Sequence, residues 1–71
     1  MAVSYNKLWK LLIDKKMNKT ELRLKADIGT ATLAKLGKNQ PVSMEVMMRI
    51  CNVLECNIAD VMDIILAEGE I

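Results

Sequence analysis

The sequence predicts an all-α domain of five short helices, on the evidence of apolar spacing and helix-capping residues. Apolar side chains recur three and four residues apart in five windows, as they do along one face of a helix. Asn18, Ser43 and Asn57 each stand immediately before one of these windows, where their side chains can accept hydrogen bonds from the first backbone N–H groups. A chain of 71 residues is sufficient for one domain, which we assign to residues 1–71.

The first predicted helix runs from about Tyr5 to Lys16, with Ser4 as its N-cap. Residues 1–3 precede it as a frayed lead or a short extended arm. The apolar side of this helix contains Leu8, Leu11 and Leu12, broadened by Trp9 and Ile13. A tryptophan within such a stripe is more often a core residue than a functional one, so we expect Trp9 in the core.

The second and third predicted helices lie between Asn18 and Leu36. Asn18 caps the second helix, and Glu21 stands three residues later at the spacing of a capping box. The corner that follows is Asp27-Ile28-Gly29, in which Asp tolerates left-handed backbone and Gly adopts it freely. Two short helices joined so closely must cross steeply, which predicts a helix-turn-helix over about residues 18–37. The second helix of such a pair can enter the major groove of DNA.

The spacing of six residues around this corner resembles the Cro and phage-repressor superfamily of helix-turn-helix regulators: Leu22, Ala26, Ile28, Thr32, Leu33 and Leu36. The resemblance extends from Tyr5 to about Ile65. The superfamily usually has Gly at the corner position that Asp27 occupies here. Either Asp27 must therefore adopt the left-handed corner itself, or Gly29 must absorb part of it.

The resemblance implies a compact five-helix, repressor-like DNA-binding domain that acts as a homodimer on a two-fold symmetric operator, with no cofactor. Lys35 could donate to guanine O6 and N7, and the Ala31 methyl could contact a thymine methyl. The positions matching the superfamily's base contacts are Thr30, Ala31 and Lys35, and those matching its phosphate contacts are Asn18, Lys19 and Thr32. A solvated surface is the alternative for each of these residues.

The third helix is predicted to end between Leu36 and Pro41. Gly37 or Asn39 can supply a left-handed closing residue, and Pro41 prevents the helix from continuing. Lys38 and Asn39 follow the third predicted helix and could hydrogen-bond phosphates, although a plain polar linker explains them equally well.

Two further helices are predicted in the second half of the chain, over Met44 to Leu54 and over about Ile58 to Ala67. The second of them has Asn57 as its cap, with Asp60 at capping-box spacing. Its docking stripe would contain Ile58, Val61, Met62 and Ile65. This leaves a surplus of apolar residues on other faces, and we assign them to a two-fold dimer interface: Ile64, Leu66 and Ile71.

The charges are distributed unevenly along the chain. Residues 1–40 contain nine basic and three acidic side chains, a net charge of +6, whereas residues 41–71 contain one basic and six acidic side chains, a net charge of −5. A positive half that includes the helix-turn-helix suits phosphate binding. An unevenly charged solvated surface is the alternative explanation.

The composition argues against other classes of protein. There is no His and no CxxC pair, so a zinc site lacks ligands, and Cys51 and Cys56 are expected to be reduced thiols in a cytoplasmic protein. No catalytic constellation, signal peptide or membrane-spanning run is apparent. The alternative function is a helical protein-interaction module, such as an antitoxin subunit, whose acidic and apolar C-terminal half would bind a protein partner.

Overall fold

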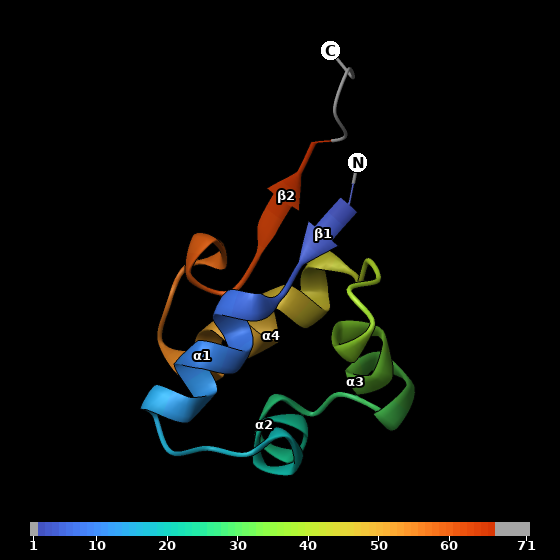
Figure 1. Cartoon of the computed structure of the whole chain (residues 1–71). Helices are drawn as coiled ribbons and strands as arrows, with labels where there is room; N and C mark the ends of the chain where they lie inside the picture. The colour runs from blue at the N-terminus through green and yellow to red at the C-terminus, as the bar shows by residue number, and fades with distance from the viewer. Residues whose placement is uncertain (1, 67–71) are drawn as a thin grey trace.

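The computed structural model describes residues 2–66 and is mostly helical in that range (Figure 1). Its elements are, in chain order, β1 (Ala2–Ser4), α1 (Asn6–Asp14), α2 (Lys19–Ala26), α3 (Thr30–Gly37), α4 (Met44–Leu54), the 3-10 helix η1 (Ile58–Asp60) and β2 (Asp63–Ile65). The helical class and the helix-turn-helix agree with the sequence prediction. The prediction of five helices is not confirmed, because the described residues contain four α-helices and a short two-stranded sheet.

The predicted fifth helix over residues 58–67 is wrong. Its first turn is the 3-10 helix η1, and the chain then becomes the strand β2, which pairs antiparallel with β1 so that Val3 lies opposite Ile64. The predicted capping box at Asn57 does form, with the Asn57 backbone N–H donating to Asp60 Oδ2 at 2.9 Å. One capped turn therefore precedes an Asp-Ile-Ile segment whose β-branched side chains favour a strand when a partner strand is available.

The sheet also decides between the two expectations for the N-terminus. Residues 2–4 form an extended strand rather than a frayed lead. The sheet projects beyond the helices at the end of the molecule opposite α2 (Figure 1).

Helix α1 is shorter than predicted, and Ser4 is not its N-cap. The N-cap is Tyr5, and the Ser4 hydroxyl instead accepts from the Asn6 backbone N–H at 3.4 Å. Ile13 does not broaden the apolar face, because it is 75% exposed. Trp9 packs partly buried against the core, as expected.

The core lies between α1, α2 and α4, and α3 contributes to it mainly through Leu36, which is fully buried. Helix α2 packs more extensively against α4 than against α3. Helix α4 has the predicted bounds, and the Ser43 hydroxyl accepts from the Val46 N–H at 3.2 Å. The other core residues come from α1, α2 and α4 and from positions just outside the helices: Tyr5, Leu8, Leu12, Leu22, Ala26, Ile28, Met47, Ile50, Leu54 and Val61.

Two hydrogen bonds fasten the segment after α3 to the start of α1. The Tyr5 backbone N–H donates to Asn39 Oδ1 at 3.1 Å, and the Tyr5 hydroxyl donates to the Gln40 carbonyl oxygen at 2.8 Å. Asn39 is the left-handed residue here, with φ of 55°, whereas Gly37 is the last residue of α3. The chain just after the carboxyl end of α3 is thereby held to the N-cap of α1.

Candidate nucleic-acid interface

The amino end of α2 is fixed by a reciprocal cap. Asn18 Oδ1 accepts from the Glu21 N–H at 2.7 Å, and the Asn18 N–H donates to Glu21 Oε1 at 3.4 Å. These bonds satisfy two of the backbone donors that the first turn of a helix leaves unpaired. The capping box predicted from the sequence is therefore confirmed.

The corner between α2 and α3 is formed by Asp27. Its backbone is left-handed, with φ of 54° and ψ of 50°, and it is the C-cap of α2. Gly29 has φ of −78° and is the N-cap of α3, so it does not share the left-handed conformation. Of the two possibilities for the corner, Asp27 is the residue that adopts it.

Arg49 of α4 reaches this corner, and the sequence reasoning missed it. One guanidinium nitrogen, Nη1, donates to the Asp27 carbonyl oxygen at 2.9 Å and lies 4.0 Å from Asp27 Oδ2. The other, Nη2, donates to Glu45 Oε1 at 3.0 Å, one turn earlier on α4. The only sequence signal was that Arg49 is the single basic residue after position 40.

The predicted base-contacting residues lie together on α3. Thr30, Ala31 and Lys35 are all exposed, while Leu36 points into the core. Their spacing places them on the outer side of a helix anchored from beneath. The arrangement leaves hydroxyl, methyl and ammonium groups free to meet base edges.

The predicted phosphate-contacting residues are divided between the two ends of the helix-turn-helix. Asn18 and Lys19 lie exposed at the start of α2, and Lys38 lies exposed just after α3. Lys19 Nζ is 4.4 Å from the centroid of the Trp9 ring, a cation–π contact that restricts where the ammonium points. Thr32 is half-buried on α3.

Asn39 has a structural task besides the predicted phosphate contact. Its Oδ1 accepts from the Tyr5 backbone N–H, so the amide NH₂ group is the part of the side chain that can donate to a phosphate. Asn39 and Tyr5 are 34 positions apart in the sequence, so no local sequence pattern predicts this bond.

The charge of the helix-turn-helix favours an anionic partner. Residues 18–38 contain five basic side chains (Lys19, Arg23, Lys25, Lys35 and Lys38) and two acidic ones (Glu21 and Asp27), a net charge of +3. This excess positive charge lies on the same segment as the exposed face of α3.

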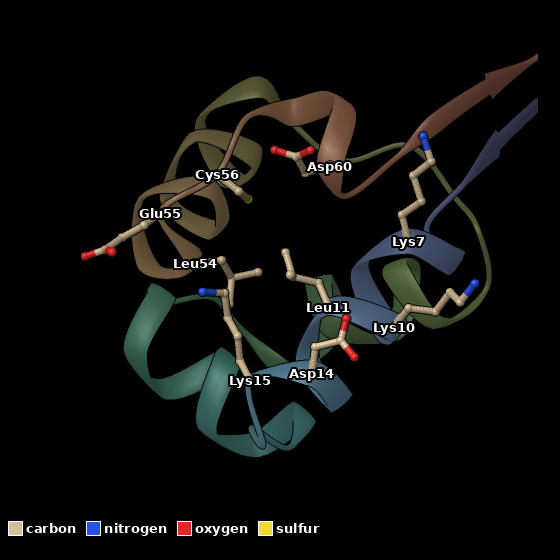
Figure 2. A pocket seen from close by; sticks show the side chains of 9 residues that line it. All are labelled: Lys7, Lys10, Leu11, Asp14, Lys15, Leu54, Glu55, Cys56 and Asp60. Atoms are coloured by element: carbon tan, nitrogen blue, oxygen red, sulfur yellow. The ribbon is translucent and has the colours of Figure 1, made fainter.

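An open hollow of about 410 Å³ between α1 and the segment from the end of α4 to η1 is a weaker candidate for a binding site (Figure 2). It is lined by three lysines and three carboxylates, so its formal charges cancel: Lys7, Lys10, Lys15, Asp14, Glu55 and Asp60. Helix α3 contributes no residue to its lining. Within residues 2–66, no group of three or more His, Cys, Asp or Glu side chains could hold a metal ion.

Cys56 also lines this hollow, and both cysteines are free thiols. Burial, followed by the neighbouring Cys51, raises the pKa of the Cys56 thiol from 9.0 to about 11. Cys56 is therefore protonated at neutral pH, which makes it a poor nucleophile. Among the described residues, no helix combines the length and hydropathy needed to cross a membrane.

Comparison with known families matches residues 7–67 to the Cro/C1-type HTH DNA-binding domain. The chain belongs to this family. The match includes the capped α2, the Asp27 corner and the whole of α3, so the geometry described above is that of a helix-turn-helix DNA-binding domain.

A solved structure supports the same assignment. The crystal structure of the transcriptional regulator VanUg, form II, is 52% identical in sequence and superposes with a TM-score of 0.86. The similarity covers 87% of this chain and 83% of the VanUg chain. A comparison with curated protein sequences gave no match.

Proposed function

We propose that the protein is a sequence-specific transcriptional regulator that binds a two-fold symmetric operator as a homodimer and represses by occupying it. The observation that carries this proposal is the exposed face of α3, where Thr30, Ala31 and Lys35 stand above the buried Leu36. We expect Thr30, Ala31 and Lys35 to contact base edges, while the flanking polar residues bind the phosphate backbone: Asn18, Lys19, Thr32, Lys38 and Asn39. The similarity to a transcriptional regulator supports the same conclusion.

The dimer would form through the apolar C-terminal surface. Ile64 and Leu66 are 58% and 67% exposed, and Ile65 between them is 50% exposed, so three consecutive aliphatic side chains offer apolar surface of the kind that marks interaction sites. Ile64 also lines a mostly apolar hollow of about 320 Å³ with Met44 and Met62. Ile71, the third residue assigned to this interface, lies outside the described residues. Burial of these side chains against a second copy would add apolar contact area that a small domain otherwise lacks.

Selection from a random duplex library at about 0.1 M salt tests the proposal, because this ionic strength partly suppresses non-specific phosphate binding. We expect enrichment of a near-palindrome whose half-site centres are about 10 base pairs apart. The absence of any enriched sequence would overturn sequence-specific regulation.

Lys35→Ala then tests the assignment of the reading helix. We expect it to weaken binding of the enriched duplex by about 10–100-fold and to relax the preference at one position in each half-site. Lys10→Ala is the matched control, since it removes an equal charge from an exposed residue of α1, outside the helix-turn-helix. Equal losses for the two variants would mean that Lys35 contributes only charge.

The same variants separate this proposal from the alternative of a protein-interaction module such as an antitoxin subunit. The exposed apolar Ile64 and Leu66 are the feature that favours the alternative. It predicts that changing these two residues to Ser abolishes binding of a protein partner while Lys35→Ala has no effect. Regulation through DNA predicts that Lys35→Ala weakens binding of the selected duplex by about 10–100-fold even where dimerisation is intact.

A further inference from the structure

We infer that Arg49 is a positioning residue for DNA reading: from α4 it holds the left-handed Asp27 corner that sets the direction of α3. This inference rests on the proposed function. It concerns a residue outside the helix-turn-helix.

The corner is the point at which the orientation of α3 is decided. Asp27 is the C-cap of α2, and Gly29, two residues later, is the N-cap of α3. Asp tolerates left-handed backbone better than most residues but less well than glycine, so a contact that holds Asp27 stabilises a conformation that glycine would adopt without help. The change of direction between the helices therefore depends on keeping Asp27 in this conformation.

Arg49 supplies that support through the main chain. Its Nη1 donates to the Asp27 carbonyl oxygen at 2.9 Å, and a charged donor makes this bond stronger than a neutral one. The Asp27 carboxylate contributes less, because its side chain is 98% exposed and its Oδ2 lies 4.0 Å from the guanidinium. The essential acceptor is thus the carbonyl group, which any residue at position 27 would provide.

The second guanidinium nitrogen of Arg49 also has a partner. Nη2 donates to Glu45 Oε1 at 3.0 Å, so the guanidinium bridges α4 and the corner with one nitrogen on each. Helix α4 packs extensively on α2, which makes it a stable base for this bridge. A lysine could not donate in two fixed directions in this way.

A double-mutant cycle on the selected duplex tests the inference. We expect Arg49→Ala to lower affinity for the selected duplex by about 10-fold while affinity for an unrelated duplex is unchanged. Because Gly adopts left-handed backbone without support, Asp27→Gly should change affinity by less than about 3-fold alone and should restore most of the affinity in Arg49→Ala/Asp27→Gly. Arg49→Lys should give an intermediate loss.

The salt dependence of binding distinguishes positioning from direct contact. Positioning predicts that the slope of log K against log salt is the same for the wild type and Arg49→Ala, whereas loss of a phosphate contact would reduce it by about 1. A reduced slope, or purely additive losses in the cycle, would overturn the inference.

Folding of each variant is checked by far-UV circular dichroism. If Arg49→Ala does not fold, the Arg49→Lys and Arg49→Lys/Asp27→Gly pair is used, with the same rescue expected. If the wild type selects no duplex, both the proposed function and this inference fail. If the wild type selects one and Arg49→Ala binds it equally well, only the inference fails.

Discussion

Replacing Tyr5 by Phe should destabilise the domain while leaving its core volume intact. Tyr5 is 1% exposed, and its hydroxyl donates to the Gln40 carbonyl oxygen at 2.8 Å. Removal of one such hydrogen bond costs about 0.5–1.5 kcal/mol. For a domain of this size, about 1 kcal/mol corresponds to a fall in Tm of about 4–8 °C.

Urea unfolding measures this loss directly. The m-value should be unchanged, because Tyr5→Phe buries the same apolar ring, and the midpoint should fall. Gln40→Ala is the matched control: the hydroxyl binds the main-chain carbonyl of residue 40, so removal of the exposed side chain should leave stability unchanged. Equal stability of Tyr5→Phe and the wild type would show that this bond does not fasten the α3–α4 segment to α1.

The same residue predicts how stability depends on pH. Burial raises the pKa of the Tyr5 hydroxyl above its ordinary value of 10.0. The folded state therefore binds the hydroxyl proton more tightly than the unfolded state does. The resulting contribution to stability is complete below pH 10 and is lost as the pH rises through the pKa of Tyr5 in the folded protein. Tyr5 is the only tyrosine, so tyrosinate absorbance follows it alone. Above pH 10, the free energy of unfolding should fall more steeply for the wild type than for Tyr5→Phe. The same pH dependence in both proteins would contradict this prediction.

Three further predictions concern the cap, the core and the thiols. Asn18→Ala should cost about 0.5–2 kcal/mol through loss of the 2.7 Å bond to the Glu21 N–H, seen as a lower thermal midpoint; a neutral change would refute the role of the cap. Leu36→Ala should cost about 2–5 kcal/mol, a large part of the total stability, because it empties a fully buried site; urea denaturation showing a loss below about 1 kcal/mol would contradict it. With its pKa raised from 9.0 to about 11, Cys56 should be alkylated roughly 100-fold more slowly at about pH 8 in the folded protein than in urea, and equal rates would count against the raised value.

The helix-turn-helix could be predicted from the sequence because its signals are local. The Asn18–Glu21 spacing predicted the cap, and the Asp27-Ile28-Gly29 segment predicted a corner, although only the structure shows that Asp27 is the left-handed residue. Both depend only on residues within one or two helical turns. Leu36 adds the buried side of α3 through its spacing alone.

The features that the sequence did not reveal depend on partners far along the chain. The strand β2 forms because Ala2–Ser4 lies beside it, and no pattern within residues 58–67 indicates that pairing. The exposure of Ile13 follows from where the other helices pack, not from the periodicity of α1. The Arg49–Asp27 bond and the Tyr5–Asn39 bond join residues 22 and 34 positions apart.

The same distinction applies to the candidate site. Side-chain types and helical spacing predicted which residues of α3 face outward, and Thr30, Ala31 and Lys35 are all exposed. The spacing could not predict that Asn39 accepts from the Tyr5 backbone or that the Lys19 ammonium makes a cation–π contact with the Trp9 ring. These contacts link residues on different elements, and they determine which donors remain available to DNA.

Amide chemical-shift mapping on the selected duplex is the most direct test of the claim that α3 reads DNA. We expect the largest perturbations on residues 30–35 and on the start of α2, with small changes on the side of α1 that lines the open hollow. Perturbations concentrated on α1 and η1, with residues 30–35 unmoved, would contradict it.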